Sequence, residues 1–345
     1  MSIRDNVRFN RTKMLDEAAI NHRPTHFLYS LLFFMIVYFV ADTARQSIML
    51  LPTMIYLFST SEFKSLLGQA SSGEMDMEAL MESYSSVLSD IASNIPWWLV
   101  LISLVSTVAL AICAILYCKI FEKRKLPTLG LRKSNIALEY GVGAIIGLAM
   151  YSLAFLIAFL TGSVKFEGGA SFSFPIILFF LAFIIQGASE EIFIRGYLMT
   201  SVARDYKVFL AVFFSSAVFS LIHISNAGVT VLALINIFLF GVFEGIYVLK
   251  RGDLWGACAI HSMWNFAQGN IFGSSVSGMG QMPSIFRVVS NPNMTAANGG
   301  AFGIEGGFAC TIVVLVAIGI ILLIPPKKSE LPDYELFRAE FNEEK

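Results

Sequence analysis

The chain has 345 residues, of which 56% are hydrophobic and only 14% are charged, and its mean hydropathy is +0.70. This much apolar sequence exceeds what a soluble domain of that length can bury, so the composition excludes a wholly soluble protein and indicates a polytopic membrane protein. The formal net charge of −1 indicates nothing about nucleic acid, and the sequence shows no nucleic-acid motif, so nucleic acid is not an expected partner. The four cysteines lie in apolar runs without C-x-x-C spacing, which is typical of buried packing residues.

Eight apolar stretches of the sequence are candidates for helices that cross a bilayer, which requires about 20 residues. The expected fold class is therefore all-α, a polytopic transmembrane helix bundle of about eight spans. The predicted spans are residues 27–44, 95–119, 137–161, 173–200, 207–224, 229–249, 254–272 and 303–324.

Basic residues alternate between the connections of these spans. They gather before the first span, between the second and third, and again at Arg204 and Lys207, at Lys250 and Arg251, and in the tail after the last span. Because cytoplasmic loops are enriched in lysine and arginine, this pattern predicts a multi-pass protein of the cell membrane with both termini cytoplasmic.

Three regions are expected along the chain. Residues 1–136 hold an N-terminal tail, two spans and a non-cytoplasmic insert, 45–94; residues 137–272 form the core; and 273–345 contain a loop, the final span and a cytoplasmic tail. The insert begins with an apolar piece that contains Pro52 and is too short to span alone, which indicates a re-entrant or interfacial segment. We expect the insert to form a cap over the non-cytoplasmic mouth of the bundle.

Ionisable and amide side chains lie inside four of the predicted core spans, although such groups are costly in lipid and usually face a bundle interior or a watery cavity. They are Glu190, Glu191 and Arg195 on the fourth span, His223 on the fifth, Asn236 and Glu244 on the sixth, and His261 and Asn265 on the seventh.

Helical spacing and depth sort these residues. Glu191 and Arg195 are four residues apart and share a helix face, which predicts an ion pair that locks the structure. Glu190 and His223 lie at nearly equal distances from the turn that joins their spans, so we expect them at one depth, within one bridging water of each other. His261 and Asn265 also share a face, and we expect them on the opposite wall of the same cavity.

These groups could together hydrolyse a bond. Glu190 could take a proton from water as a general base, while His223 shares that water or protonates a leaving amine. His261 and Asn265 could donate hydrogen bonds to an oxyanion. Alternatively, Glu190, His223 and His261 could ligate a catalytic zinc ion, although the H-E-x-x-H signature is absent.

Simpler roles are also open for these side chains. Either histidine alone could be an interhelical hydrogen-bond contact, and Asn236 a packing hydrogen bond. Glu244 lies toward the cytoplasmic end of its span and could simply reach the interface.

Three motifs in order resemble the CAAX protease and bacteriocin-processing (CPBP, Abi) family of intramembrane proteases. "EEIFIR" at 190–195 matches E-E-x-x-x-R, "FSLIH" at 219–223 matches F-x-x-x-H, and "HSMWN" at 261–265 matches H-x-x-x-N/D. The resemblance covers roughly 137–272, and "GIEGGFACT" at 303–311 is similar to a segment found after the core of some bacterial members.

The resemblance implies an intramembrane endopeptidase that cleaves a membrane-associated protein or peptide; eukaryotic members remove the last three residues of prenylated CAAX proteins. It makes Glu190 and His223 the water-activating pair, His261 and Asn265 the oxyanion stabilisers, and Glu191 and Arg195 the organisers of the site. The family was first described as metalloproteases, but we favour a metal-free mechanism without a required cofactor. The alternatives are a non-catalytic membrane scaffold or immunity-type protein that keeps the pocket, and a proton-coupled transporter.

Overall fold

The computed structural model of the protein describes residues 13–19, 27–72, 76–133 and 135–325, and most of these residues are helical. Helices occupy all eight predicted positions: α3 (Phe27–Ser59), α6 and α7 (Trp97–Ser106 and Val108–Ile120), α8 (Ile136–Leu160), α9 with η2 and α10 (Pro175–Glu191, Ile192–Met199 and Thr200–Asp205), α11 (Val208–Leu221), α12 (Val231–Arg251), α13 with η3 (Trp255–Phe266 and Ala267–Ile271), and α15 (Phe308–Leu323). Five of these helical stretches are long and apolar enough to cross a membrane, and α11 and α15 are shorter apolar helices. The predicted all-α membrane bundle is confirmed.

Helix α3 extends further than the sequence indicated. It continues without a break through Pro52 to Ser59, so residues 45–59 belong to the first helix rather than to a separate re-entrant or interfacial piece. The polar residues that resembled the end of a span satisfy one another within the helix. Nη2 of Arg45 donates to Oδ1 of Asp42 over 2.7 Å, and Nε2 of Gln46 donates to Oδ2 of Asp42 over 2.5 Å.

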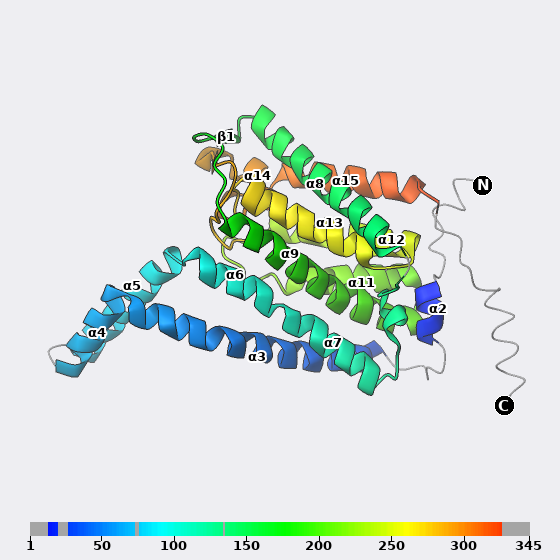
Figure 1. Ribbon diagram of the computed structural model, residues 1–345, viewed down its shortest axis with the longest axis horizontal. Helices are drawn as coiled ribbons and strands as arrows, with labels where there is room; N and C mark the ends of the chain where they lie inside the picture. The colour runs from blue at the N-terminus through cyan, green and yellow to red at the C-terminus, as the bar shows by residue number, and fades with distance from the viewer. Residues whose placement is uncertain (1–12, 20–26, 73–75, 134, 326–345) are drawn as a thin grey trace, which may run out of the picture.

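The core of the bundle is built around α13, which packs closely against α8 and α9, while α12 packs between α11 and α15. Figure 1 shows these six helices as one group with α13 in the middle. A short antiparallel pair, β1 (Val164–Phe166) and β2 (Val288–Ser290), joins the α8–α9 connection to the loop that follows α13. This loop, expected to be irregular, also contains η4 (Pro292–Met294), α14 (Thr295–Asn298), η5 (Gly300–Phe302) and η6 (Ile304–Gly306).

The N-terminal helices α3, α6 and α7 form a wing beside this core, and α7 contacts α3, α9 and η2. The insert forms α4 (Ser61–Ser72) and α5 (Met77–Ser93), which pack on each other at the far tip of the wing and point away from the core (Figure 1). None of the described residues between 47 and 94 lines the cavity of the core. The expected cap over the mouth is therefore not formed, because α3 carries the hairpin outward along its own axis.

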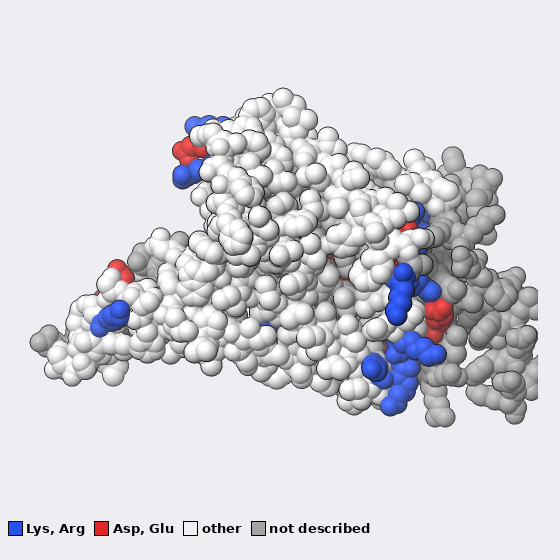
Figure 2. All heavy atoms as spheres, viewed as in Figure 1, with Lys and Arg blue, Asp and Glu red and all other residues white. Residues whose placement is uncertain are grey.

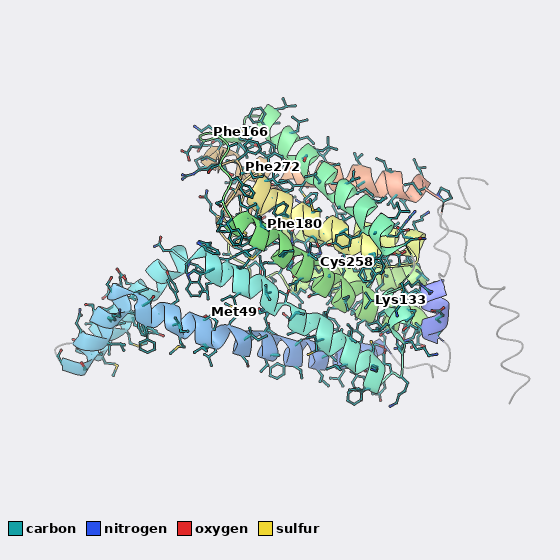
Figure 3. The ribbon with its side chains drawn as sticks, viewed as in Figure 1. Met49, Lys133, Phe166, Phe180, Cys258 and Phe272 are labelled. Atoms are coloured by element: carbon teal, nitrogen blue, oxygen red, sulfur yellow. The ribbon has the colours of Figure 1, made fainter. Side chains whose placement is uncertain are left out.

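The opposite end of the molecule carries most of the basic side chains on the face shown in Figure 2. The α7–α8 connection lies there, with its 3-10 turn η1 (Leu126–Leu129) and Lys133, whereas Phe166 and Phe272 mark the other end of the core (Figure 3). The small helix α2 (Lys13–Ala19) packs on η1 and α10 at the same basic end. This gathering agrees with alternate basic connections on one membrane face.

Candidate active site

The predicted lock between Glu191 and Arg195 forms at the junction of α9 and η2. Nη1 of Arg195 donates to Oε1 of Glu191 over 2.8 Å, and both side chains are 0% exposed. Arg195 also donates to the carbonyl oxygen of Gly241 on α12 over 3.3 Å, and its guanidinium lies 4.5 Å from the ring centre of Phe219 on α11. One buried cation therefore connects three helices behind the site. Its own segment, η2, is π-helical, a distortion often found at functional sites.

His261 on α13 lies between the two glutamates. Its Nδ1 is 2.9 Å from Oε1 of Glu191, and its Nε2 is 3.7 Å from Oε2 of Glu190. The expectation that His261 faces Glu190 from the opposite wall is therefore wrong. Close contact of α9 with α13 accounts for the difference: a Cβ atom on Gly187 would lie only 2.5 Å from Oγ of Ser262, so only glycine permits this approach.

Gln186 joins the remaining groups and was not among the residues predicted from the sequence. Its Nε2 donates to Oε1 of Glu190 over 2.8 Å, and its Oε1 accepts a hydrogen bond from Nδ2 of Asn265 over 3.0 Å. The same Nε2 lies 3.5 Å from Nε2 of His261. Asn265 is therefore on the same wall as Glu190, and its amide reaches the carboxylate through Gln186. Gln186 precedes Glu190 by four residues, and this spacing was the only signal for its role.

His223 lines the same cavity as this cluster. The cavity has a volume of about 510 Å³ and is bounded by α3, α6, α7, α9, α11 and the turn after it, α12, α13, the loop after α13, and α15. Nδ1 of His223 lies 2.7 Å from the carbonyl oxygen of Phe219, and the two rings are 4.9 Å apart. Within the described parts of the chain, no hydrogen bond or ion pair joins His223 to Glu190, so the structure brings the two to one cavity but not into contact.

The two candidate residues on α12, Asn236 and Glu244, have different roles. Asn236 is more than a packing contact, because its Nδ2 donates to the carbonyl oxygens of Glu305 and Gly307 over 2.8 and 2.9 Å and so anchors the segment before α15. Glu244 does not reach the interface, as the sequence had suggested: it is 0% exposed. It lies deep in the core, within electrostatic reach of Glu191 and Arg195.

The residues proposed as zinc ligands are not arranged as a metal site. In the ranges that the structure describes, no group of three or more histidine, cysteine, aspartate or glutamate side chains could hold a metal ion. Glu190 and His261 approach each other, but His223 is not part of their cluster. We therefore derive no catalytic step through a metal.

The fold and this cluster define a polytopic helical membrane protein with a carboxylate, two histidines and two amides in a cavity of its core. Residues 172–267 match the family described as type II CAAX prenyl endopeptidase Rce1-like. The matched segment contains all three motifs, from Glu190 to Asn265, and confirms the resemblance to the CAAX protease family. No curated protein matches the chain.

Proposed function

We propose that the protein is an intramembrane endopeptidase, which hydrolyses peptide bonds of a membrane-associated protein or peptide with a water molecule activated by Glu190. One observation carries this proposal. Glu190 is a carboxylate inside a membrane-spanning bundle, only 13% exposed, and it faces a cavity together with His223, His261 and Asn265. Lone structural carboxylates are costly at such a depth, so a functional role is the expected reason for its presence.

In the proposed reaction Glu190 takes a proton from a water molecule as the water attacks the scissile carbonyl carbon. Gln186 fixes Oε1 of Glu190, which leaves Oε2 to act as the base. Glu191 differs from its neighbour because its Oε1 is held by both Arg195 and His261. The adjacent glutamates therefore have different roles: Glu190 is the reactive base, and Glu191 holds His261 in place.

Two donors on the same wall suit the oxyanion that forms on the carbonyl oxygen. Nδ1 of His261 lies against Glu191, and its Nε2 is 3.7 Å from Oε2 of Glu190 in the wall of the cavity. A ring protonated at Nε2 therefore offers one hydrogen bond beside the base. Asn265 lines the same cavity, and the N–H of its amide that is not donated to Gln186 offers a second. Donors placed in advance at a developing negative charge are the largest single contribution in many enzymes.

His223 lies elsewhere on the cavity wall, and we propose that it protonates the leaving amine. Since Nδ1 donates to the carbonyl oxygen of Phe219, the imidazolium form of His223 would deliver its Nε2 proton to the nitrogen when the peptide bond breaks. Glu190 then releases to solvent the proton that it took from water, and His223 regains one from solvent, so the overall reaction consumes only water. This division of roles modifies the resemblance, in which His223 shares the water with Glu190. Here His261 is the histidine beside the base.

We further propose that the protein resides in the cell membrane with both termini cytoplasmic and requires no cofactor. The test is hydrolysis by the purified full-length protein in lipid nanodiscs. A farnesylated peptide ending in a CAAX sequence is the probe, and mass spectrometry detects release of its last three residues. Glu190→Gln keeps the shape of the side chain but removes the base, and we expect it to lower turnover about 100-fold or more.

Treatment with a chelator in the same assay tests whether hydrolysis requires a metal ion. Unchanged turnover after treatment with a chelator agrees with the metal-free mechanism, whereas a loss that added zinc restores would replace it. Equal turnover by the wild type and Glu190→Gln would refute the role of Glu190.

A further inference from the structure

A second carboxylate, Glu305, lines the cavity of the proposed active site. It lies in η6, directly before α15, and therefore outside residues 172–267, which match the family. Glu305 is only 9% exposed. The reaction proposed above makes no use of it.

Neutral groups hold the carboxylate of Glu305 in place. The backbone N–H and the hydroxyl of Ser277 both donate to its Oε1, the hydroxyl over 2.8 Å. Its carbonyl oxygen is fixed by Asn236. No lysine or arginine in the described ranges forms an ion pair with Glu305.

The backbone around Glu305 is shaped to bring it to the cavity. Gly303 has a φ of +104°, and a Cβ atom there would lie 2.0 Å from the carbonyl oxygen of Ser275. Only glycine allows the segment that carries Glu305 to pack so closely on the turn that carries Ser277. The position of the carboxylate is thus built into two interlocked loops.

A buried carboxylate without a cationic partner is unfavourable. Donors to Oε1 reduce this penalty but do not balance the charge. The other carboxylates of the cavity differ, because Asp42 pairs with Arg45 over 2.7 Å and Glu190 lies beside His261. Glu305 instead lies within electrostatic reach of His223, whose positive charge is lost when its proton passes to the leaving amine.

We propose that Glu305 binds an alkylammonium group of the peptide on the leaving-group side of the scissile bond. This inference rests on the proposed function. Hydrolysis adds water across the peptide bond: the carbonyl carbon gains the hydroxyl oxygen, and the nitrogen receives a proton from His223 and becomes a new amino terminus. At neutral pH that terminus is an ammonium ion. Glu305 then receives the product, or a lysine side chain next to the cleaved bond.

The test measures binding rather than turnover, so that it is separable from the proposed reaction. The full-length Glu190→Gln protein in nanodiscs is titrated with three apolar tripeptides by isothermal calorimetry: one with a free amino terminus, its N-acetylated form, and an N-acetylated form with one lysine. A hydrogen bond to a charged group implies that the free amine binds about tenfold or more tightly than the acetylated peptide. Recovery of binding by the lysine peptide would identify a side-chain ammonium as a ligand of the same site.

Adding Glu305→Gln should abolish the preference for the amine and leave the acetylated peptide unaffected, because glutamine keeps the acceptor for Ser277 but not the charge. Asp42→Asn is the matched control: this carboxylate lines the same cavity but is already paired, so the preference should persist. Equal binding of free and acetylated peptides, or a preference that survives Glu305→Gln, would overturn the proposal. If Glu305→Gln lowers the unfolding temperature, the proposal is judged on the protein that retains Glu305, by comparing its affinities for the free and the acetylated peptide. A protein that binds amines selectively but never cleaves a peptide would refute the proposed reaction alone.

Discussion

Replacing Gln186 by methionine tests whether the position of the base, rather than its presence alone, controls the reaction. The change keeps the length of the side chain but removes the donor that holds Oε1 of Glu190 at 2.8 Å and the acceptor that holds Asn265 at 3.0 Å. A hydrogen bond to a charged group is worth about 1.5–3 kcal/mol. If that stabilisation is fully expressed in the transition state, kcat falls by about 10- to 150-fold.

The assay is the nanodisc hydrolysis of the farnesylated peptide, with kcat and KM measured separately. We expect the loss in kcat, because Gln186 contacts the catalytic groups, and little change in KM. A double-mutant cycle sharpens the test: in a Glu190→Gln background Gln186→Met should cause almost no further loss, since no carboxylate remains to be positioned. Gln186→Glu retains an acceptor for Asn265 but places a second negative charge against Glu190, and it should also be impaired.

Two results would refute this reasoning. One is a kcat within twofold of the wild type for Gln186→Met. The other is a loss of the same size with and without Glu190, which would show that Gln186 supports the fold and not the base.

Three further changes test the structure around the site. Glu191→Leu leaves Arg195 charged and unpaired in the core and should lower the free energy of unfolding by about 3–5 kcal/mol. Denaturation in mixed micelles measures this change, and a variant as stable as the wild type would contradict the predicted lock. Gly187→Ala introduces a methyl group against α13 and should destabilise the protein by about 1–3 kcal/mol and reduce turnover, whereas an unchanged unfolding temperature would show that the helices can separate. Burial is the largest single influence on Glu122 and favours its neutral form, but Arg204 and Arg124 together outweigh it, so the pKa of this carboxyl is lowered from 4.5. Its contribution to stability is therefore present above pH 4.5 and lost as the pH falls through the lower folded value, so the unfolding temperature should fall more steeply below pH 4.5 in the wild type than in Glu122→Gln.

The sequence was sufficient for the positions of the helices and for the members of the cluster other than Gln186. Apolar length identifies every span, because lipid admits only segments whose backbone groups are satisfied internally. The spacing of Glu191 and Arg195 also predicted their contact, because residues four apart are neighbours on any helix.

Contacts between segments far apart in the chain could not be predicted in the same way. Helical spacing places His261 and Asn265 on one face but does not say which neighbour that face meets, and the close approach at Gly187 decides it. Glu305 reaches the cavity only because two loops interlock through glycines. The course of α3 was missed because Asp42 and Arg45 resemble the end of a span until their mutual pairing is seen.

The most direct test of the proposed activity lets the cell's own membrane proteins serve as candidate substrates. Membranes from cells that express the wild-type protein or Glu190→Gln at equal levels are compared by mass spectrometry of protein amino and carboxyl termini. We predict that a defined set of membrane proteins has shortened or newly formed termini with the wild type, and that these termini are absent with Glu190→Gln. Identical termini in the two membranes would contradict peptidase activity and favour a non-catalytic scaffold that retains the pocket.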